Sequence, residues 1–166
     1  MKASISIDLD GIACYYKIHA LGPPPAELQH AILERALPRA AALFARHGIH
    51  VTWFVVGGDV DGHAGNAERL KALAAAGDEL GNHSYSHPYE LARLPQATVD
   101  REITRCDQVL RTLTARVHGF RAPGYDVSAG MFDVLARLGY RYDSSVFPSP
   151  GYYAAKAAVL SALAAL

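Results

Sequence analysis

The sequence has few cysteines, no net charge and no long hydrophobic run. Its two cysteines, Cys14 and Cys106, are too few for the disulfide framework of a small secreted domain, and we interpret them as unpaired thiols in a reducing compartment. The 16 Lys and Arg residues balance the 16 Asp and Glu residues, so the formal net charge is zero. Nucleic acids and anionic membranes are bound by clustered basic residues, and this balance argues against both as the main partner.

Membrane-spanning and secretory segments are also missing from the pattern. The most apolar stretch, residues 154–166, is shorter than the roughly 20 residues that a membrane-spanning helix requires. Residues 1–11 lack the basic and apolar regions of a secretory signal. We therefore predict a cytoplasmic protein without a transmembrane segment. Its 166 residues, 51% of them hydrophobic and with no linker or repeat, predict a single domain over residues 1–166.

Strand-like and helical segments alternate along the chain, which is typical of an α/β fold with a mostly parallel sheet. Strands are predicted at residues 4–9, 51–56, 78–81, 119–122 and 140–147. Helices are predicted at residues 27–46, 66–76, 98–113, 128–138 and 153–166, and residues 12–25 are expected to form a loop. Cys106 shares the apolar face of the helix at 98–113 with Val99 and Ile103, so we expect it in the core.

Four polar clusters directly follow predicted strands. In a parallel sheet the carboxyl ends of the strands meet at one edge, where α/β folds place their sites. The sequence therefore predicts that these clusters come together. They are Asp8 with Asp10, His83 with His87, Arg121 with Pro123, and Asp143 with Ser144 and Ser145.

The spacing of His83 and His87 fits a metal site. On a helical turn, residues four apart share one face and can bind the same ion. Asp10, from another strand end, would complete a two-histidine and one-carboxylate site with open positions. The alternative is a polar loop whose histidines only cap neighbouring groups.

Asp8 and Asp10 are two residues apart, so an extended backbone points both side chains the same way. If Asp10 binds a metal, Asp8 can act as a general base. Alternatively, the two residues only close the strand as an Asx turn. Arg121 is a candidate partner that keeps Asp8 ionised, or else a surface residue. Gly124 would let a backbone N–H approach a substrate as an oxyanion donor.

Five motifs together resemble the polysaccharide deacetylase family, carbohydrate esterase family 4, whose catalytic unit is the NodB homology domain. They span residues 4–148 and are SIDLDG at 6–11, TWFVVG at 52–57, GNHSYSH at 81–87, FRAPGY at 120–125 and GYRYDSS at 139–145. The resemblance implies a distorted (β/α) barrel, and it implies that Asp8 is the base and Arg121 orients it. It further implies a divalent metal on Asp10, His83 and His87, and an oxyanion donor in the backbone after Pro123, at Gly124.

The chain departs from the family pattern in three places. Leu9 separates the two aspartates, which resembles a subgroup with peptidoglycan deacetylase-like and small-amide hydrolases. No histidine follows residue 147, where the family has its general acid, so we expect a catalytic domain truncated at its C-terminal end, with an incomplete barrel. Alternatively, another residue such as His19, or another subunit, supplies the acid. Residues 12–25 replace a short turn and are expected to shape or cover the pocket.

From these observations we predict a metal-dependent hydrolase of linear amide bonds that removes the N-acetyl group of an amino sugar in a polysaccharide or glycan precursor. Zinc is the default metal, and cobalt, nickel, manganese and iron suit the same ligands. One alternative is hydrolysis of a non-glycan or formyl amide. Another is a non-catalytic metal- or glycan-binding domain without the acid. Tyr85, Tyr89 and Tyr125 are either packing residues or flat faces for a sugar ring.

Overall fold

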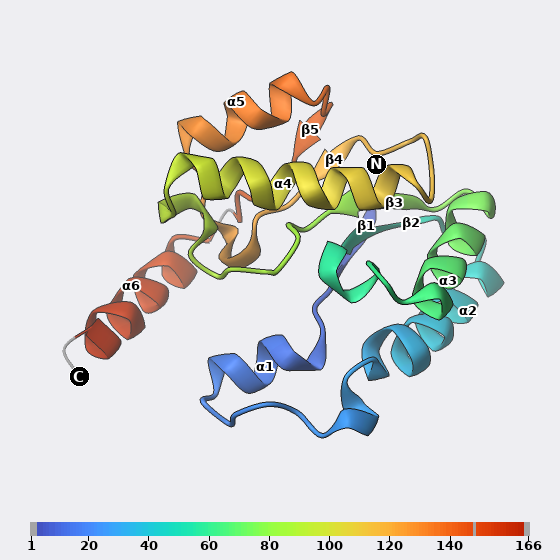
Figure 1. Cartoon of the computed structure of the whole chain (residues 1–166), viewed down its shortest axis with the longest axis horizontal. Coiled ribbons are helices and arrows are strands. Elements are labelled where there is room, and N and C mark those ends of the chain that lie inside the picture. Colours follow the sequence, from blue (N-terminus) through green and yellow to red (C-terminus); the bar gives the residue numbers. More distant parts are fainter. Residues whose placement is uncertain (1–2, 148, 165–166) are drawn as a thin grey trace.

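The computed structural model describes residues 3–147 and 149–164, and its centre is a parallel sheet (Figure 1). The strands are β1 (Ile5–Leu9), β2 (Val51–Val55), β3 (Glu79–Asn82), β4 (Gly119–Phe120) and β5 (Tyr142–Asp143). Each strand pairs with the strand before it in the chain. The register aligns the strand ends, because Leu9, Val55, Asn82, Phe120 and Asp143 pair in one row across the sheet. The residues that follow this row therefore share one edge.

Helices follow one another around the sheet (Figure 1). They are α1 (Ile12–Ile18), α2 (Leu37–Arg46), α3 (Ala64–Ala75), α4 (Gln96–Arg111), α5 (Ala129–Arg137) and α6 (Pro150–Ala164). Parallel strands in sequential order, joined by right-handed crossovers, place the connecting helices on the same face of the sheet. This arrangement confirms the α/β class. It is also compatible with consecutive units of a barrel, although the strands in the described residues form an open sheet.

The core lies between the sheet and these helices. Trp53 and Leu80 of the sheet pack with Leu70 of α3 in one cluster, and all three are fully buried. A second cluster joins α4, α5 and β4 around Ile103. Cys106 is fully buried in the first cluster, which confirms its predicted core position.

Two predicted elements differ from the structure near the N-terminus. Residues 12–25 are not all loop, because α1 forms where no Gly or Pro interrupts residues 12–19. The helix predicted at 27–46 is divided into a 3₁₀ turn (Ala26–Leu28), a π-helical turn (Ile32–Ala36) and α2. Pro38 has no backbone N–H and cannot continue the α-helical hydrogen bonds at this junction.

The strands predicted at 119–122 and 140–147 are also too long. Beyond β4, the N–H of Ala122 donates to the hydroxyl of Ser145 (2.8 Å) instead of to a neighbouring strand. The N–H of Ser145 in turn donates to the carboxylate of Asp143 (3.0 Å). These bonds to side chains replace the strand ladder.

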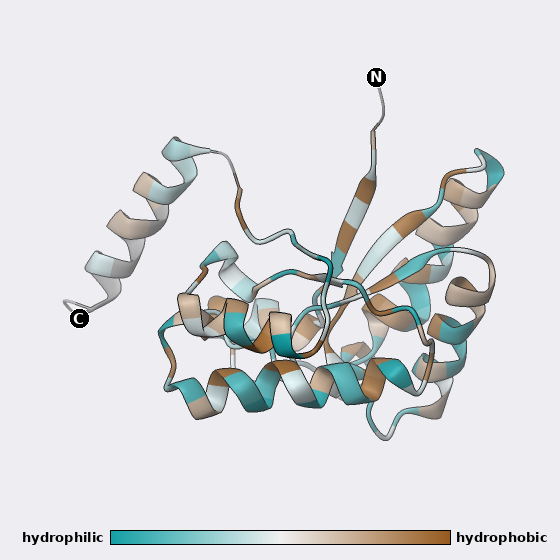
Figure 2. Ribbon diagram, turned by 90° about the horizontal axis from the view of Figure 1, so that it is seen from above, coloured by the Kyte–Doolittle hydropathy of each residue, from teal (hydrophilic) through white to brown (hydrophobic). Residues whose placement is uncertain are grey.

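The C-terminal helix projects from the body of the molecule (Figures 1 and 2). It begins at Pro150, three residues before the predicted start, and the last two residues of the predicted helix, 165–166, lie outside the described residues. Within the described chain, none of the helices has the length and apolar character to cross a membrane.

Candidate active site

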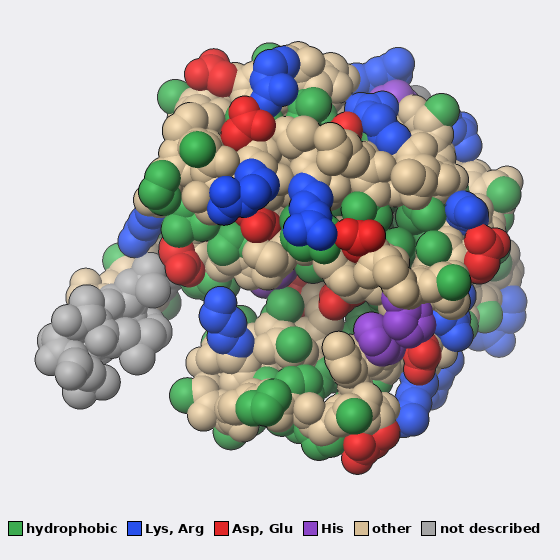
Figure 3. Space-filling view, in the orientation of Figure 1, with side chains coloured by type: hydrophobic (Ala, Val, Ile, Leu, Met, Phe, Trp, Pro, Cys, Tyr) green, Lys and Arg blue, Asp and Glu red, His purple; other side chains and the backbone are tan. Residues whose placement is uncertain are grey.

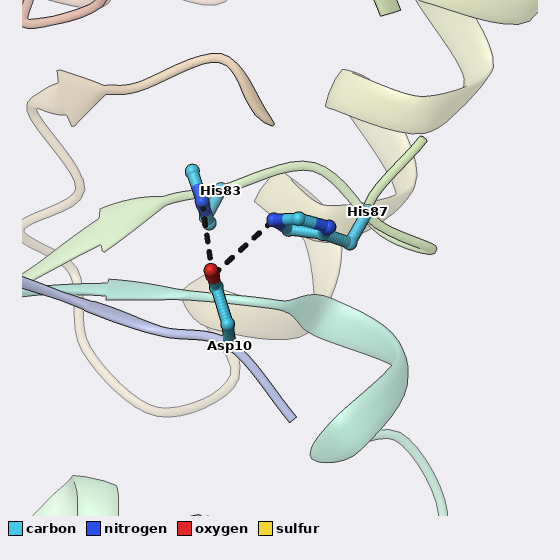
Figure 4. Close-up of side chains that lie close together, drawn as sticks. All are labelled: Asp10, His83 and His87. Carbon is cyan, nitrogen blue, oxygen red and sulfur yellow. Dashed lines mark ion pairs between the residues drawn. The ribbon is translucent and has the colours of Figure 1, made fainter. Parts of the chain in front are cut away.

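The metal ligands predicted from the sequence converge in the structure (Figure 4). Asp10 follows β1, and His83 and His87 lie in the segment after β3. The Nε2 atoms of His83 and His87 lie 3.3 and 3.2 Å from Asp10 Oδ1. Two ligand atoms bound to one tetrahedral zinc ion lie about 3.4 Å apart, so this spacing suits a metal.

The chemistry of the donors fits a cation as well. Asp10 Oδ1 is buried and has no hydrogen-bond partner in the described chain, although it faces two imidazoles. The Nδ1 atom of His83 lies 2.6 Å from the carbonyl oxygen of Arg121. When the proton of the neutral imidazole is on Nδ1 and is donated to this carbonyl, the Nε2 atom keeps its lone pair for a metal. Metal-binding histidines are commonly oriented in this way.

The electrostatics of this group favour positive charge. Burial raises the pKa of Asp10, but the neighbouring imidazoles of His83 and His87 outweigh burial and hold this pKa below its usual value. Burial by itself lowers the pKa of His87. The interactions of its imidazole with Asp10, together with those with Cys14, outweigh burial and raise this pKa to about 10. Asp10 is therefore ionised at neutral pH and supplies the negative charge that a cation site requires.

The spacing of His83 and His87 predicted a helical turn, but the two residues do not lie on one. The segment from His83 to His87 is a loop, and Ser84 and His87 adopt left-handed backbone angles with φ of 63° and 54°. Two side chains fold it locally: Asn82 Oδ1 accepts from the N–H of Ser84 (2.9 Å), and Ser84 Oγ accepts from the N–H of His87 (3.2 Å). Tight turning, rather than helical periodicity, brings the imidazoles together.

Glu102 of α4 anchors the same loop. Its Oε2 atom accepts from the N–H groups of Tyr85 (3.1 Å) and Ser86 (2.7 Å), and Oε1 accepts from the Ser86 hydroxyl (2.9 Å). Glu102 is not among the predicted site residues, although it lies three residues after Val99 on the inward face of α4. A carboxylate on the apolar face of a helix is the signal that could have identified it.

Replacing Glu102 by alanine should weaken zinc binding by about 10–100-fold, because two N–H groups of the ligand loop lose their acceptor. Glutamine should cause a smaller loss, since its amide oxygen can still accept from both. Isothermal titration calorimetry measures both affinities, and Glu68→Ala, at an exposed position of α3, is the matched control. Unchanged zinc affinity in Glu102→Ala would show that the loop keeps its shape without Glu102.

Asp8 is held from two sides. Arg121 Nη1 lies 2.6 Å from Asp8 Oδ1, and the hydroxyl of Tyr125 donates to Oδ2 at 2.9 Å. The side chains of Asp8 and Arg121 are 16% and 11% exposed, so this pair is partly shielded from water. The contact with Tyr125 is not among the sequence predictions.

Arg121 is itself fixed by several partners. Its Nη2 donates to the hydroxyls of Ser6 (2.8 Å) and Ser144 (2.8 Å), and its Nε donates to the Ser144 carbonyl (3.2 Å). The guanidinium carbon lies 4.2 Å from the centre of the Phe54 ring, a cation–π contact. Arg121 is therefore a largely shielded side chain fixed by several partners, rather than a surface residue.

Gly124 lies in the tight turn after β4. Its φ of 70° is in the left-handed region, and a Cβ atom there would collide with the carbonyl oxygen of Tyr89. The collision excludes a side chain at this position, and the positive φ also favours glycine. The turn begins two residues after Arg121, and Gly124 is buried in it.

Two other predicted candidates take positions outside this group. His19 is exposed at the end of α1, and none of its hydrogen bonds in the described chain reaches Asp8, Asp10 or the ligand histidines. The ring of Tyr85 is covered on one face by Arg105, whose Cζ lies 3.7 Å from the ring centre. One face of Tyr85 is therefore unavailable for a sugar.

Comparison with known proteins identifies the family. The family model described as polysaccharide deacetylase matches residues 27–142, which is more than half of the chain. The chain belongs to the polysaccharide deacetylase family. The matched region includes His83, His87 and Arg121, while Asp8 and Asp10 precede it. The family assignment made from the five motifs is thus confirmed.

Relatives of this deacetylase-family chain are distant and longer. A peptidoglycan deacetylase of Helicobacter pylori (strain ATCC 700392 / 26695) is 25% identical over 143 residues, which cover 84% of this chain and 47% of the relative. The chain spans less than half the length of the curated relatives that it matches.

Solved structures share the fold. A candidate polysaccharide deacetylase of Mycobacterium smegmatis aligns with a TM-score of 0.72 and 23% identity, over 88% of this chain and 51% of that chain. A carbohydrate esterase family 4 pseudoenzyme of Bacillus anthracis aligns with a TM-score of 0.62 and 18% identity, over 84% and 41% of the two chains. The likeness to both structures shows the fold alone.

Proposed function

We propose that this chain hydrolyses the amide bond of an N-acetylated amino sugar within a polysaccharide or glycan precursor, with a bound divalent metal. One observation carries the proposal. Asp8, which is hydrogen-bonded to Arg121, lies two residues before Asp10 in the chain. Asp10 in turn converges with His83 and His87 at the same edge of the sheet. Family membership supports a deacetylase, and a base beside a cation site is what metal-assisted amide hydrolysis uses.

The chain's own residues divide the work. Asp8 takes a proton from the attacking water, while Arg121 holds the Asp8 carboxylate in position through the Nη1–Oδ1 contact. The backbone N–H at Gly124 is our candidate donor to the developing oxyanion. Asp10, His83 and His87 would hold the metal, whose chemistry when bound is to polarise the acyl oxygen and to lower the pKa of water. We propose zinc, with cobalt, nickel, manganese and iron as metals that the same ligands accept.

The shape of the molecule suits an extended substrate. Figure 3 shows a hollow between the α1 segment and the layer that carries α4, bordered by apolar and charged side chains. The carboxyl end of β1, the strand that carries Asp8, leads towards α1, which borders this hollow (Figure 1). A glycan offers both ring faces and hydroxyls to such a mixed surface.

The proposal is tested by measuring acetate release from N-acetylglucosamine oligosaccharides with the zinc-loaded chain. Chelation with EDTA should lower the rate more than about tenfold, and added zinc should restore it. Asp10→Ala should lose both zinc and activity, whereas Glu68→Ala, which removes an exposed carboxylate paired with Lys71, should keep both.

Two other outcomes would replace the proposal. Acyl release from a formyl or ureide amide, with none from acetylated sugars, would favour the small-amide hydrolase. Zinc and glycan binding with no acyl release would favour a non-catalytic domain. The second outcome has a structural counterpart, because a Bacillus anthracis pseudoenzyme shares this fold and a mutant of it has restored enzymatic activity.

A further inference from the structure

Tyr125 is a second hydrogen-bond donor on the proposed base. Its hydroxyl lies 2.9 Å from Asp8 Oδ2, while Arg121 occupies Oδ1. A guanidinium stays charged at physiological pH and does not release a proton. A phenol can do so. Of these two donors on Asp8, Tyr125 is therefore the one with a transferable proton.

The Tyr125 side chain is held in one position. Its backbone has a φ of 60°, a left-handed conformation that is uncommon for a bulky residue and often found at functional sites. Its ring contacts those of Phe147 and Tyr152, with centroids 5.8 and 6.1 Å away. The hydroxyl of Tyr153 also donates to the Tyr125 carbonyl (3.3 Å). These contacts from the segment after β5 hold the Tyr125 hydroxyl within hydrogen-bond distance of Asp8.

The hydroxyl carries its proton at neutral pH. Burial and the neighbouring carboxylate of Asp8 raise the pKa of Tyr125 to about 12. The side chain is only half-buried, so its hydroxyl can meet a substrate that reaches Asp8.

Resting on the proposed function, we infer that the Tyr125 hydroxyl passes a proton from Asp8 to the leaving amine nitrogen. When water adds to the acyl carbon, a new C–O bond forms and one water proton goes to Asp8. When the C–N bond breaks, the nitrogen takes the phenolic proton, and the phenol oxygen takes the proton from Asp8. Carboxylate and phenol are then restored, with no further reactant.

Tyr125→Phe tests this relay, because phenylalanine keeps the ring and removes the hydroxyl. The kcat for acetate release from N-acetylated oligosaccharides should fall by about 100-fold or more. The kcat for 4-nitrophenyl acetate should change by less than about threefold, since 4-nitrophenolate leaves without a proton. Zinc affinity, measured by calorimetry, should stay equal to that of the wild type.

Tyr142→Phe is the matched control. Burial and the Glu79 carboxylate also raise the pKa of Tyr142 to about 12, but this residue lies on β5 outside the site. Removing the Tyr142 hydroxyl should leave kcat unchanged for both the N-acetylated oligosaccharide and 4-nitrophenyl acetate.

Four outcomes would overturn the relay. Equal losses on amide and ester would show that Tyr125 only positions Asp8, and an unchanged amide rate would show that its proton is not used. Lost zinc binding would show that Tyr125 maintains the metal site. A wild-type chain that cleaves the ester but no amide, or neither substrate, would overturn the proposed function together with the relay. The first three outcomes overturn the relay alone.

Discussion

Asp8→Asn should lower kcat for acetate release by about 10²–10⁴-fold, because an amide cannot take the proton from water. Asparagine has nearly the same size, and Arg121 keeps its bonds to Ser6 and Ser144, so the surrounding structure should remain. Zinc affinity should change little, since Asp8 is not one of the converging ligands. Steady-state acetate release and calorimetry measure the two quantities.

Asp100→Asn is the control for this experiment. Asp100 is an exposed carboxylate on α4 that pairs with Arg137 at 2.6 Å, and its replacement should leave kcat unaltered. An Asp8→Asn enzyme with more than about a tenth of wild-type kcat would remove Asp8 from the role of base.

His83→Ala should weaken zinc binding by more than about 100-fold, because only two protein ligands would remain and zinc sites use three or four. Elemental mass spectrometry of the purified protein and calorimetry of the metal-free protein measure the loss. Acetate release should fall with zinc occupancy.

Because the His83 side chain is 2% exposed, alanine also leaves a cavity, so a second variant is needed. Asp10→Asn keeps the volume and removes the ligand charge, and it should show the same loss. His47→Ala, an exposed residue after α2, should retain zinc. Full zinc occupancy in both site variants would exclude this metal centre.

Local patterns in the sequence were enough to predict the class of fold. The alternation of strands and helices reflects periods of two and about four residues, which are visible within a short window. Buried positions on α4, such as Val99, Ile103 and Cys106, followed from the same periodicity. Element lengths were less predictable, because β4 and β5 end where side chains such as Ser145 replace strand partners.

The candidate metal site was predictable for a related reason. Parallel strands bring their carboxyl ends to one edge, so polar residues that follow different strands are expected to meet. The loop geometry was not predictable in this way. The His83–His87 segment is shaped by Asn82, Ser84 and Glu102, and a spacing of four residues is compatible with either a helical turn or such a loop.

The α/β class, the family and the residue types that gather at the sheet edge could be read from the amino-acid sequence. Which oxygen faces which partner depends on the three-dimensional packing. Tyr125 and Asp8 are 117 positions apart, and Glu102 reaches Ser86 from 16 positions away. Such contacts depend on strand register and on packing between distant segments, and local periodicity carries no information about either.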